Sequence, residues 1–271
     1  MALRFNLRTR GCAIADVIDA FFCVPKKGNV KRLEDCVPYG ENLASLLGAS
    51  GVSGAVVAPC ACSECPHVWN CAERRTQEVV DIVARSPNEL RGLACYDPLR
   101  IGDSLRWIDK AITAGKLVGG YAQAGCSVSG LDAARKYPLY GLCAKLRSPM
   151  VIEFASTERW VNHRPQVEVV AADFPELDLV LVPPPETEAA SIMQILKRFP
   201  RISFLLCPRE LQSNFALREY VEHQGRDRVL FRSSADGWTH SVETALALPL
   251  NLEAKEAYFS GNAKRLFGFL Q

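Results

Sequence analysis

The sequence predicts a (β/α)8 TIM barrel built as a single domain over residues 1–271. Strand-length apolar segments alternate with helix-like segments along the chain. The strands are almost continuously apolar, which is typical of parallel strands whose outer face is covered by helices. Eight such units in 271 residues fit one closed barrel, a fold that takes about 250 residues. No linker, internal repeat or low-complexity tract divides the sequence.

The expected strands are short apolar runs that stop at prolines, aspartates or glycine-containing loops. The first opens with β-branched residues and closes on a proline, and the sixth stops at three consecutive prolines. In chain order the eight strands are Val17–Pro25, Val52–Pro59, Leu90–Tyr96, Leu117–Ala122, Pro149–Phe154, Leu177–Val182, Ile202–Leu206 and Val229–Arg232.

The expected helices carry apolar residues at helical spacing. In the second helix, for example, Val79, Val80, Ile82 and Val83 supply the face that packs on the sheet. The helices are Asn42–Leu47, Ala72–Ala84, Asp103–Ala114, Pro138–Leu146, Gln166–Ala172, Glu188–Arg198, Ala216–His223 and two further helices at the C-terminus.

The composition indicates a cytoplasmic protein. Eleven cysteines are an odd number, and a chain of this length needs no disulfide framework, so we expect free or metal-bound thiols in a reducing compartment. Asp16 and Asp19 interrupt the N-terminal apolar stretch, and no apolar run approaches the roughly 20 residues of a membrane helix. We therefore expect no membrane partner. We also expect no nucleic-acid partner, and homo-oligomerisation is left open.

Several stretches resemble one family of barrels. The chain closes on Gly261-Asn262-Ala263-Lys264-Arg265-Leu266-Phe267-Gly268, and its first strand contains Ile18-Asp19. Further marks are Gly92-Leu93-Ala94-Cys95-Tyr96-Asp97-Pro98, Tyr137-Pro138-Leu139-Tyr140, Phe174-Pro175-Glu176-Leu177 and Arg228-Val229-Leu230-Phe231. Together they resemble the amidohydrolase-related (amidohydrolase-2 type) family of metal-dependent (β/α)8 barrels. The resemblance implies hydrolysis of amides, esters or lactones, or decarboxylation of aromatic or unsaturated acids.

The metal ligands that this resemblance implies are missing from the sequence. The family places histidines and an aspartate at strand ends where this chain has Phe21, Cys23, Glu153, Pro183, and Ser234 or Asp236. The side chains of Phe21 and Pro183 carry no ligand atom, whereas a zinc or manganese site needs several converging ligands. We therefore expect no metal at the family's usual position, and we take Glu153, Asp236 and Cys23 as the catalytic candidates.

Glu153 interrupts the apolar strand Met150–Phe154 and should point into the barrel mouth. A buried carboxylate requires a partner or a raised pKa, and both situations are common at catalytic positions. Two interpretations follow: Glu153 acts as a general acid or base, or it is a structural carboxylate paired with an arginine or with backbone amides.

A cysteine-rich loop follows the second expected strand. Cys60, Cys62 and Cys65 have a C-x-C-x-x-C spacing that lets three thiolates bind one ion, and Cys71 could complete the set, as could Cys23 or His67. Zinc or an iron–sulfur cluster would suit these ligands. The alternative is that the thiols are simply reduced. Cys143, inside a predicted helix, is expected to be a buried apolar side chain.

Three further side chains near strand ends are weaker candidates. Arg209 could face a substrate carboxylate, although an exposed ion pair with the neighbouring Glu210 explains it as well. Trp238 and His240 either line the pocket or begin the next helix.

Two functions compete on this basis. The first is a divergent small-molecule hydrolase or decarboxylase-like acid–base enzyme that lacks the family's usual metal site. The second is a non-catalytic barrel that binds a metal or an iron–sulfur cluster through the cysteine-rich loop, or that partners an active paralogue.

Overall fold

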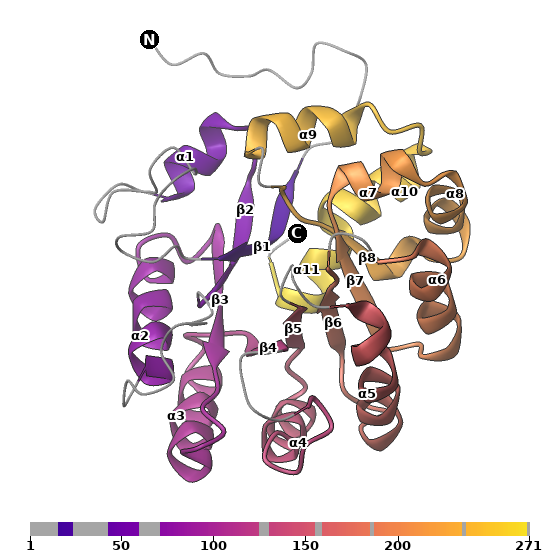
Figure 1. Cartoon of the computed structure of the whole chain (residues 1–271). Coiled ribbons are helices and arrows are strands. Elements are labelled where there is room, and N and C mark those ends of the chain that lie inside the picture. Colours follow the sequence, from indigo (N-terminus) through magenta and orange to yellow (C-terminus); the bar gives the residue numbers. More distant parts are fainter. Residues whose placement is uncertain are drawn as a thin grey trace. The chain divides into compact units, whose positions relative to one another are not determined.

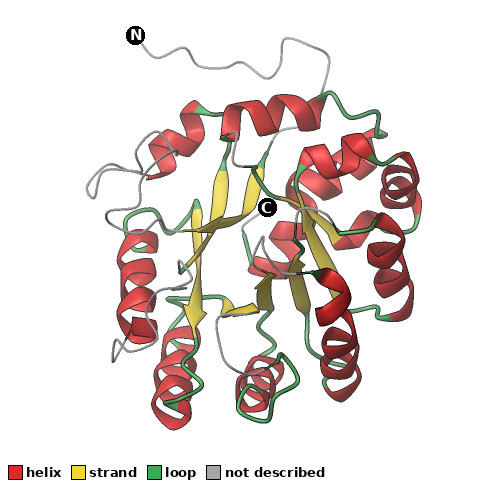
Figure 2. Ribbon diagram, in the orientation of Figure 1, coloured by secondary structure: helices red, strands yellow, loops and turns green. Residues whose placement is uncertain are grey.

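The structure is a computed structural model that describes residues 16–23, 43–59, 71–124, 130–154, 159–184, 187–234 and 237–269. Strands and helices alternate along the chain (Figure 1), and the ribbon coloured by secondary structure shows the same succession (Figure 2). The strands are β1 (Ile18–Cys23), β2 (Gly54–Ala58), β3 (Leu90–Cys95), β4 (Gly119–Ala124), β5 (Met150–Phe154), β6 (Leu179–Val182), β7 (Ile202–Leu206) and β8 (Val229–Phe231).

The helices occupy the connections between the strands and the C-terminal region. They are α1 (Leu43–Ala49), α2 (Cys71–Val83), α3 (Ile101–Thr113), α4 (Tyr137–Leu146), α5 (Trp160–Asp173), α6 (Ala189–Arg198), α7 (Pro208–Ser213), α8 (Phe215–His223), the 3-10 turn η2 (Arg226–Arg228), α9 (Trp238–Leu246), α10 (Leu252–Glu256), the π-helical turn η3 (Ala257–Gly261) and α11 (Asn262–Phe267). Within the described parts of the chain, no helix is both long enough and apolar enough to cross a membrane.

The eight strands form one sheet in chain order, β1 to β8. The pairs from β3–β4 through β6–β7 are parallel. Strands β1 and β8 also contact each other, so the two ends of the strand order meet. This is the topology of a (β/α)8 barrel. The fold class predicted from the sequence, a single-domain (β/α)8 TIM barrel, is confirmed.

The chain groups into two compact units. The first unit takes in the described parts of Met1–Val57, Ile82–Arg91 and Leu205–Gln271, and the second those of Ala58–Asp81 and Gly92–Phe204.

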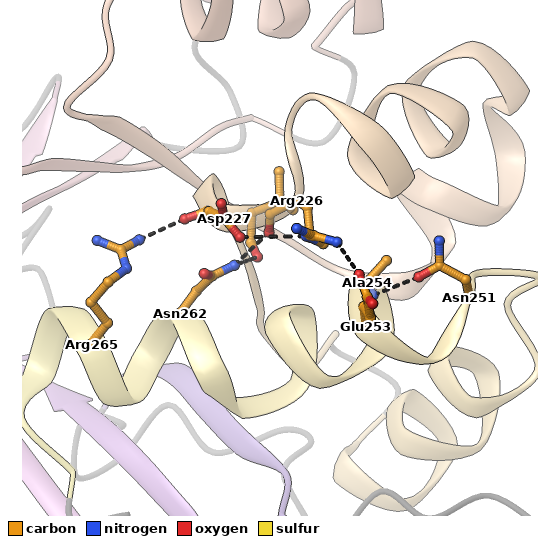
Figure 3. A network of polar contacts seen from close by, with 8 residues as sticks. Arg226, Asp227, Asn251, Glu253, Ala254, Asn262 and Arg265 are labelled. Carbon is orange, nitrogen blue, oxygen red and sulfur yellow. Dashed lines mark hydrogen bonds and ion pairs between the residues drawn. The ribbon is translucent and has the colours of Figure 1, made fainter.

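In the first unit, the asparagine of the C-terminal motif at residues 261–268 makes two hydrogen bonds to the backbone before and at the start of β8. The side-chain amide of Asn262 donates to the backbone oxygens of Arg226 and Val229, both at 2.8 Å, and the side chain is almost fully buried (Figure 3). Arg265, one helical turn later, donates to the backbone oxygen of Asp227 at 2.6 Å. Because an unpaired buried carbonyl costs about 1–3 kcal/mol, these contacts fix the start of β8 against α11. The motif is therefore structural at these two positions.

In the second unit, a glycine lets helix α4 approach the sheet closely. A Cβ atom on Gly120 would lie 2.9 Å from the sulfur of Cys143, so a larger residue there would require the Cys143 side chain to shift. The Cys143 thiol is completely buried, and burial raises its pKa to about 12. The expectation that Cys143 is a buried apolar side chain is confirmed.

Two helices differ from the sequence prediction. Helix α5 begins at Trp160 rather than after Pro165, because Trp160 is held by a 2.8 Å hydrogen bond to Ser191 and by edge-on packing against Phe154 and Phe204. These contacts outweigh the loss of a helical hydrogen bond at Pro165, about 3 kcal/mol in a helix interior. The second difference is helix α7, which was not predicted and follows β7 directly.

Candidate functional site

Catalytic groups of (β/α)8 barrels sit at the carboxyl ends of the strands. The structure places several of the predicted positions there. Glu153 is the fourth residue of β5, Pro183 follows β6 directly, and Ser234 lies three residues beyond β8. The remaining candidates lie outside the described residues or have side chains that are not described: Cys23, Cys60, Cys62, Cys65, Cys71 and Asp236.

In the second unit, strand register places Glu153 beside polar neighbours. Glu153 pairs with Gln123 of β4 and Val182 of β6, and side chains of register partners point to the same face. Because Gly120 faces helix α4, the alternation of side chains puts Tyr121, Gln123 and Glu153 on the opposite, inner face. Glu153 and Gln123 are both half-buried. The expected inward orientation of Glu153 therefore agrees with the register.

The Glu153 carboxylate is oriented by a tyrosine. The hydroxyl of Tyr121, whose side chain is 1% exposed, donates to Oε2 of Glu153 at 2.5 Å. A phenol that donates to a carboxylate stabilises the charged, proton-accepting form. The arrangement resembles a general base held in place by a fixed donor.

In the first unit, a buried carboxylate joins β1 to the segment after β8. Asp19 is completely buried and accepts from the hydroxyl of Ser233 at 2.6 Å, the indole N–H of Trp238 at 2.9 Å and the backbone N–H of Ser233 at 3.2 Å. The backbone N–H of Phe21 adds a fourth contact at 3.3 Å. Both carboxylate oxygens are thus occupied by donors. We interpret Asp19 as a structural connection between β1 and the start of α9.

Burial raises the pKa of Asp19 above its ordinary value of 3.8, while the hydrogen bonds from Ser233 and Trp238 act in the opposite direction. The indole ring of Trp238 also packs on Phe22, with 5.3 Å between ring centroids. Trp238 is therefore held at both its N–H group and its ring. His240, two residues further along α9, is exposed.

A second polar group of the first unit follows β7 and β8. Glu210 accepts from the backbone N–H of Cys207 at 2.6 Å and pairs with Arg232 at 3.4 Å. The neighbouring Arg209 is exposed. Burial, followed by the charge of Glu210, raises the pKa of the Cys207 thiol, so this thiol is protonated at neutral pH.

Of the described side chains at the family's expected ligand positions, only Glu153 and Ser234 carry an oxygen atom. Among the described residues, no group of three or more histidine, cysteine, aspartate or glutamate side chains could hold an ion. Phe21 and Pro183 offer no ligand atom at two of the expected positions, and Glu153 is engaged by Tyr121. We derive no catalytic step through a metal at this position.

The structure is thus a (β/α)8 barrel with a carboxylate, Glu153, near the carboxyl end of β5. A sequence comparison then gives the family. The sequence model of the amidohydrolase family matches residues 66–269, most of the chain. The protein belongs to the amidohydrolase family. A search of the curated proteins finds no match.

Solved structures with the same fold include two decarboxylases. A 5-carboxyvanillate decarboxylase from Novosphingobium aromaticivorans, solved with bound manganese, has a TM-score of 0.71 at 14% identity, covering 93% of this chain and 96% of its own. A 2,6-dihydroxybenzoate decarboxylase from Rhizobium has a TM-score of 0.67 at 14% identity, covering 93% and 98%. A dihydroorotase from Campylobacter jejuni has a TM-score of 0.63 at 13% identity, covering 94% and 84%. At these identities the likeness concerns the fold.

Proposed function

We propose that this protein is a small-molecule acid–base enzyme of the amidohydrolase family, in which Glu153 is the general base and no divalent metal occupies the family's usual position. The observation that carries the proposal is the hydrogen bond from Tyr121 to Glu153 on the inner face of β4 and β5. Family membership and the decarboxylases among the similar structures support a hydrolase or decarboxylase-like reaction.

Of these two reactions, the geometry favours hydrolysis. Glu153 accepts a hydrogen bond from Tyr121, and its proposed role as a general base requires the ionised carboxylate. A substrate carboxylate placed about 4 Å from it would be repelled by about 4 kcal/mol at an effective dielectric constant of about 20. A neutral amide, ester or lactone carbonyl meets no such repulsion. We infer that the group that reacts at Glu153 is neutral.

The hydrolytic step then follows ordinary acid–base chemistry. Glu153 takes a proton from a water molecule as the water oxygen bonds to the substrate carbonyl carbon. When the tetrahedral intermediate collapses, the bond to the leaving nitrogen or oxygen breaks, and the protonated Glu153 returns the proton to that atom. Tyr121 holds the carboxylate in place in both half-steps, because its hydroxyl stays bound to Oε2.

A panel of small molecules tests the proposal. Neutral lactones, esters and cyclic amides, and in parallel hydroxybenzoic acids, are incubated with purified protein, and the products are followed by mass spectrometry. We expect mass gains of one water on at least one neutral carbonyl substrate and no loss of carbon dioxide from the acids. Decarboxylation without any hydrolysis would contradict the assignment of Glu153 as a base acting on water.

The non-catalytic alternative rests on the cysteines at 60, 62, 65 and 71. Neither zinc nor an iron–sulfur cluster there is tested by the described residues, because these side chains are not among them. The cytoplasmic location and the absence of nucleic-acid and membrane partners likewise remain predictions.

A further inference from the structure

Arg232 is a cation held at the carboxyl end of β8. Its backbone N–H donates to the oxygen of Leu206, so the sheet ladder continues one residue past the end of the strand. Phe231, the residue before it, packs on Tyr258 and Phe259 with centroid distances of 5.7 and 5.6 Å. Because side chains alternate along a strand, Arg232 points to the opposite face of the sheet, away from η3.

The guanidinium of Arg232 is largely buried, and only part of its hydrogen-bonding capacity is taken by the described residues. Its side chain is 19% exposed, the ε N–H donates to the backbone oxygen of Leu205 at 3.1 Å, and Nη2 reaches Oε1 of Glu210 at a long 3.4 Å. The other oxygen of Glu210 is taken by the Cys207 amide. Nη1 makes no hydrogen bond to any residue that the structure describes, and this atom is not fully buried. One edge of the guanidinium is therefore open to the surface.

A guanidinium with one edge fixed and one edge open is suited to bind an anion. Its planar donors match the two oxygens of a carboxylate, and the contacts to Leu205 and Glu210 fix its orientation before binding. We propose that Arg232 binds the carboxylate group of a small-molecule ligand at the carboxyl end of β8.

Binding of a simple carboxylate tests the assignment without turnover. The midpoint of thermal unfolding is measured against benzoate concentration, with benzamide at the same ionic strength as the neutral comparison. A ligand that binds only the folded state stabilises it by RT ln(1 + [L]/Kd), so Tm rises with the ligand concentration. We expect benzoate to raise the Tm of the wild-type protein and benzamide to leave it unchanged. Equal shifts with both would overturn the proposal, because the charge would then not be recognised.

Two substitutions of Arg232 assign the effect to this side chain. Arg232→Gln should abolish the benzoate shift. Arg232→Lys keeps the charge and serves where the glutamine variant does not fold; it should weaken benzoate binding by about tenfold or more, since lysine lacks the planar fork. Arg265→Gln is the matched control, because Arg265 also binds a backbone carbonyl of the first unit but is exposed, and it should keep the full shift.

The outcomes separate this inference from the proposed function. Unchanged benzoate affinity in Arg232→Lys would overturn the assignment, as would a loss of the shift in Arg209→Gln. Glu153→Gln should retain the benzoate shift. A shift that depends on Arg232 in a protein without hydrolase activity would leave the anion site standing and refute the proposed function. Hydrolysis without any benzoate shift would support the proposed function and refute the anion site.

Discussion

Replacing Glu153 by glutamine should lower kcat for hydrolysis by about 10²–10⁴-fold, the usual contribution of a positioned general base. Glutamine keeps the shape of the side chain and can still accept the hydrogen bond from Tyr121. It cannot take a proton from water. KM should change little, because the substitution removes an interaction made in the transition state. Steady-state kinetics on the substrate found in the panel measure the effect.

Two further variants show whether the loss of kcat comes from the base function of Glu153. Tyr121→Phe keeps the buried ring but removes the donor, and it should lower kcat by about 10–100-fold, equivalent to a hydrogen bond to a charged group of about 1.5–3 kcal/mol. Glu176→Gln, an exposed glutamate of the same unit in the turn before β6, should behave as wild type. Wild-type turnover in Glu153→Gln would show that Glu153 is the structural carboxylate of the alternative interpretation.

The second large effect concerns stability. Asp19→Asn should lower the free energy of unfolding by about 1–3 kcal/mol, the cost of one buried donor left without an acceptor. Asparagine offers one acceptor oxygen where Asp19 uses two, and the indole N–H of Trp238 cannot reverse its direction as the Ser233 hydroxyl can. Urea unfolding followed by circular dichroism measures the change.

The control is an aspartate three residues earlier. Asp16 pairs with Lys264 at 2.6 Å and is 41% exposed, so Asp16→Asn should cost less than about 1 kcal/mol. If Asp19→Asn instead kept the wild-type stability and lost turnover, Asp19 would be a catalytic group rather than a connection between β1 and α9.

The same carboxyl group gives a pH dependence of known sign. Burial raises the pKa of Asp19 above 3.8, so the folded chain keeps this proton to a higher pH than the unfolded chain does. The stabilisation is complete below about pH 4 and is lost as the pH rises through the folded-state pKa. In Asp19→Asn this component of the pH dependence should be absent.

The fold could be predicted from the sequence because apolar strand segments and amphipathic helices alternate without a break. Strand β7 coincides with its prediction, whereas α5 and α7 do not. Helix α7 has a signal that could have been used: Pro208 at its first position and Glu210 closing a capping box with Cys207. Helix α5 depends on the contacts of Trp160 with distant residues, which local propensity does not contain.

Only part of the candidate site could be predicted from the sequence. Glu153 could be found because a single carboxylate stands out in an apolar strand. Asp19 shows the same pattern, yet its role depends on Ser233 and Trp238, which lie 214 and 219 residues further along the chain. The sequence suggested a pair of Arg209 with its neighbour Glu210 and gave no sign that the fold also brings Arg232 to Glu210. Partners that only the tertiary structure brings together could not be predicted.

The most direct test of metal-independent acid–base chemistry measures metal content and turnover on the same samples. Wild type and the Cys62→Ser/Cys65→Ser double variant, purified anaerobically, are assayed before and after dialysis against a chelator. We expect hydrolysis to persist unchanged in all four samples, and any bound zinc or iron to be present only in the wild type before chelation. Turnover that disappears on chelation and returns with added Mn²⁺ or Zn²⁺ would contradict the account.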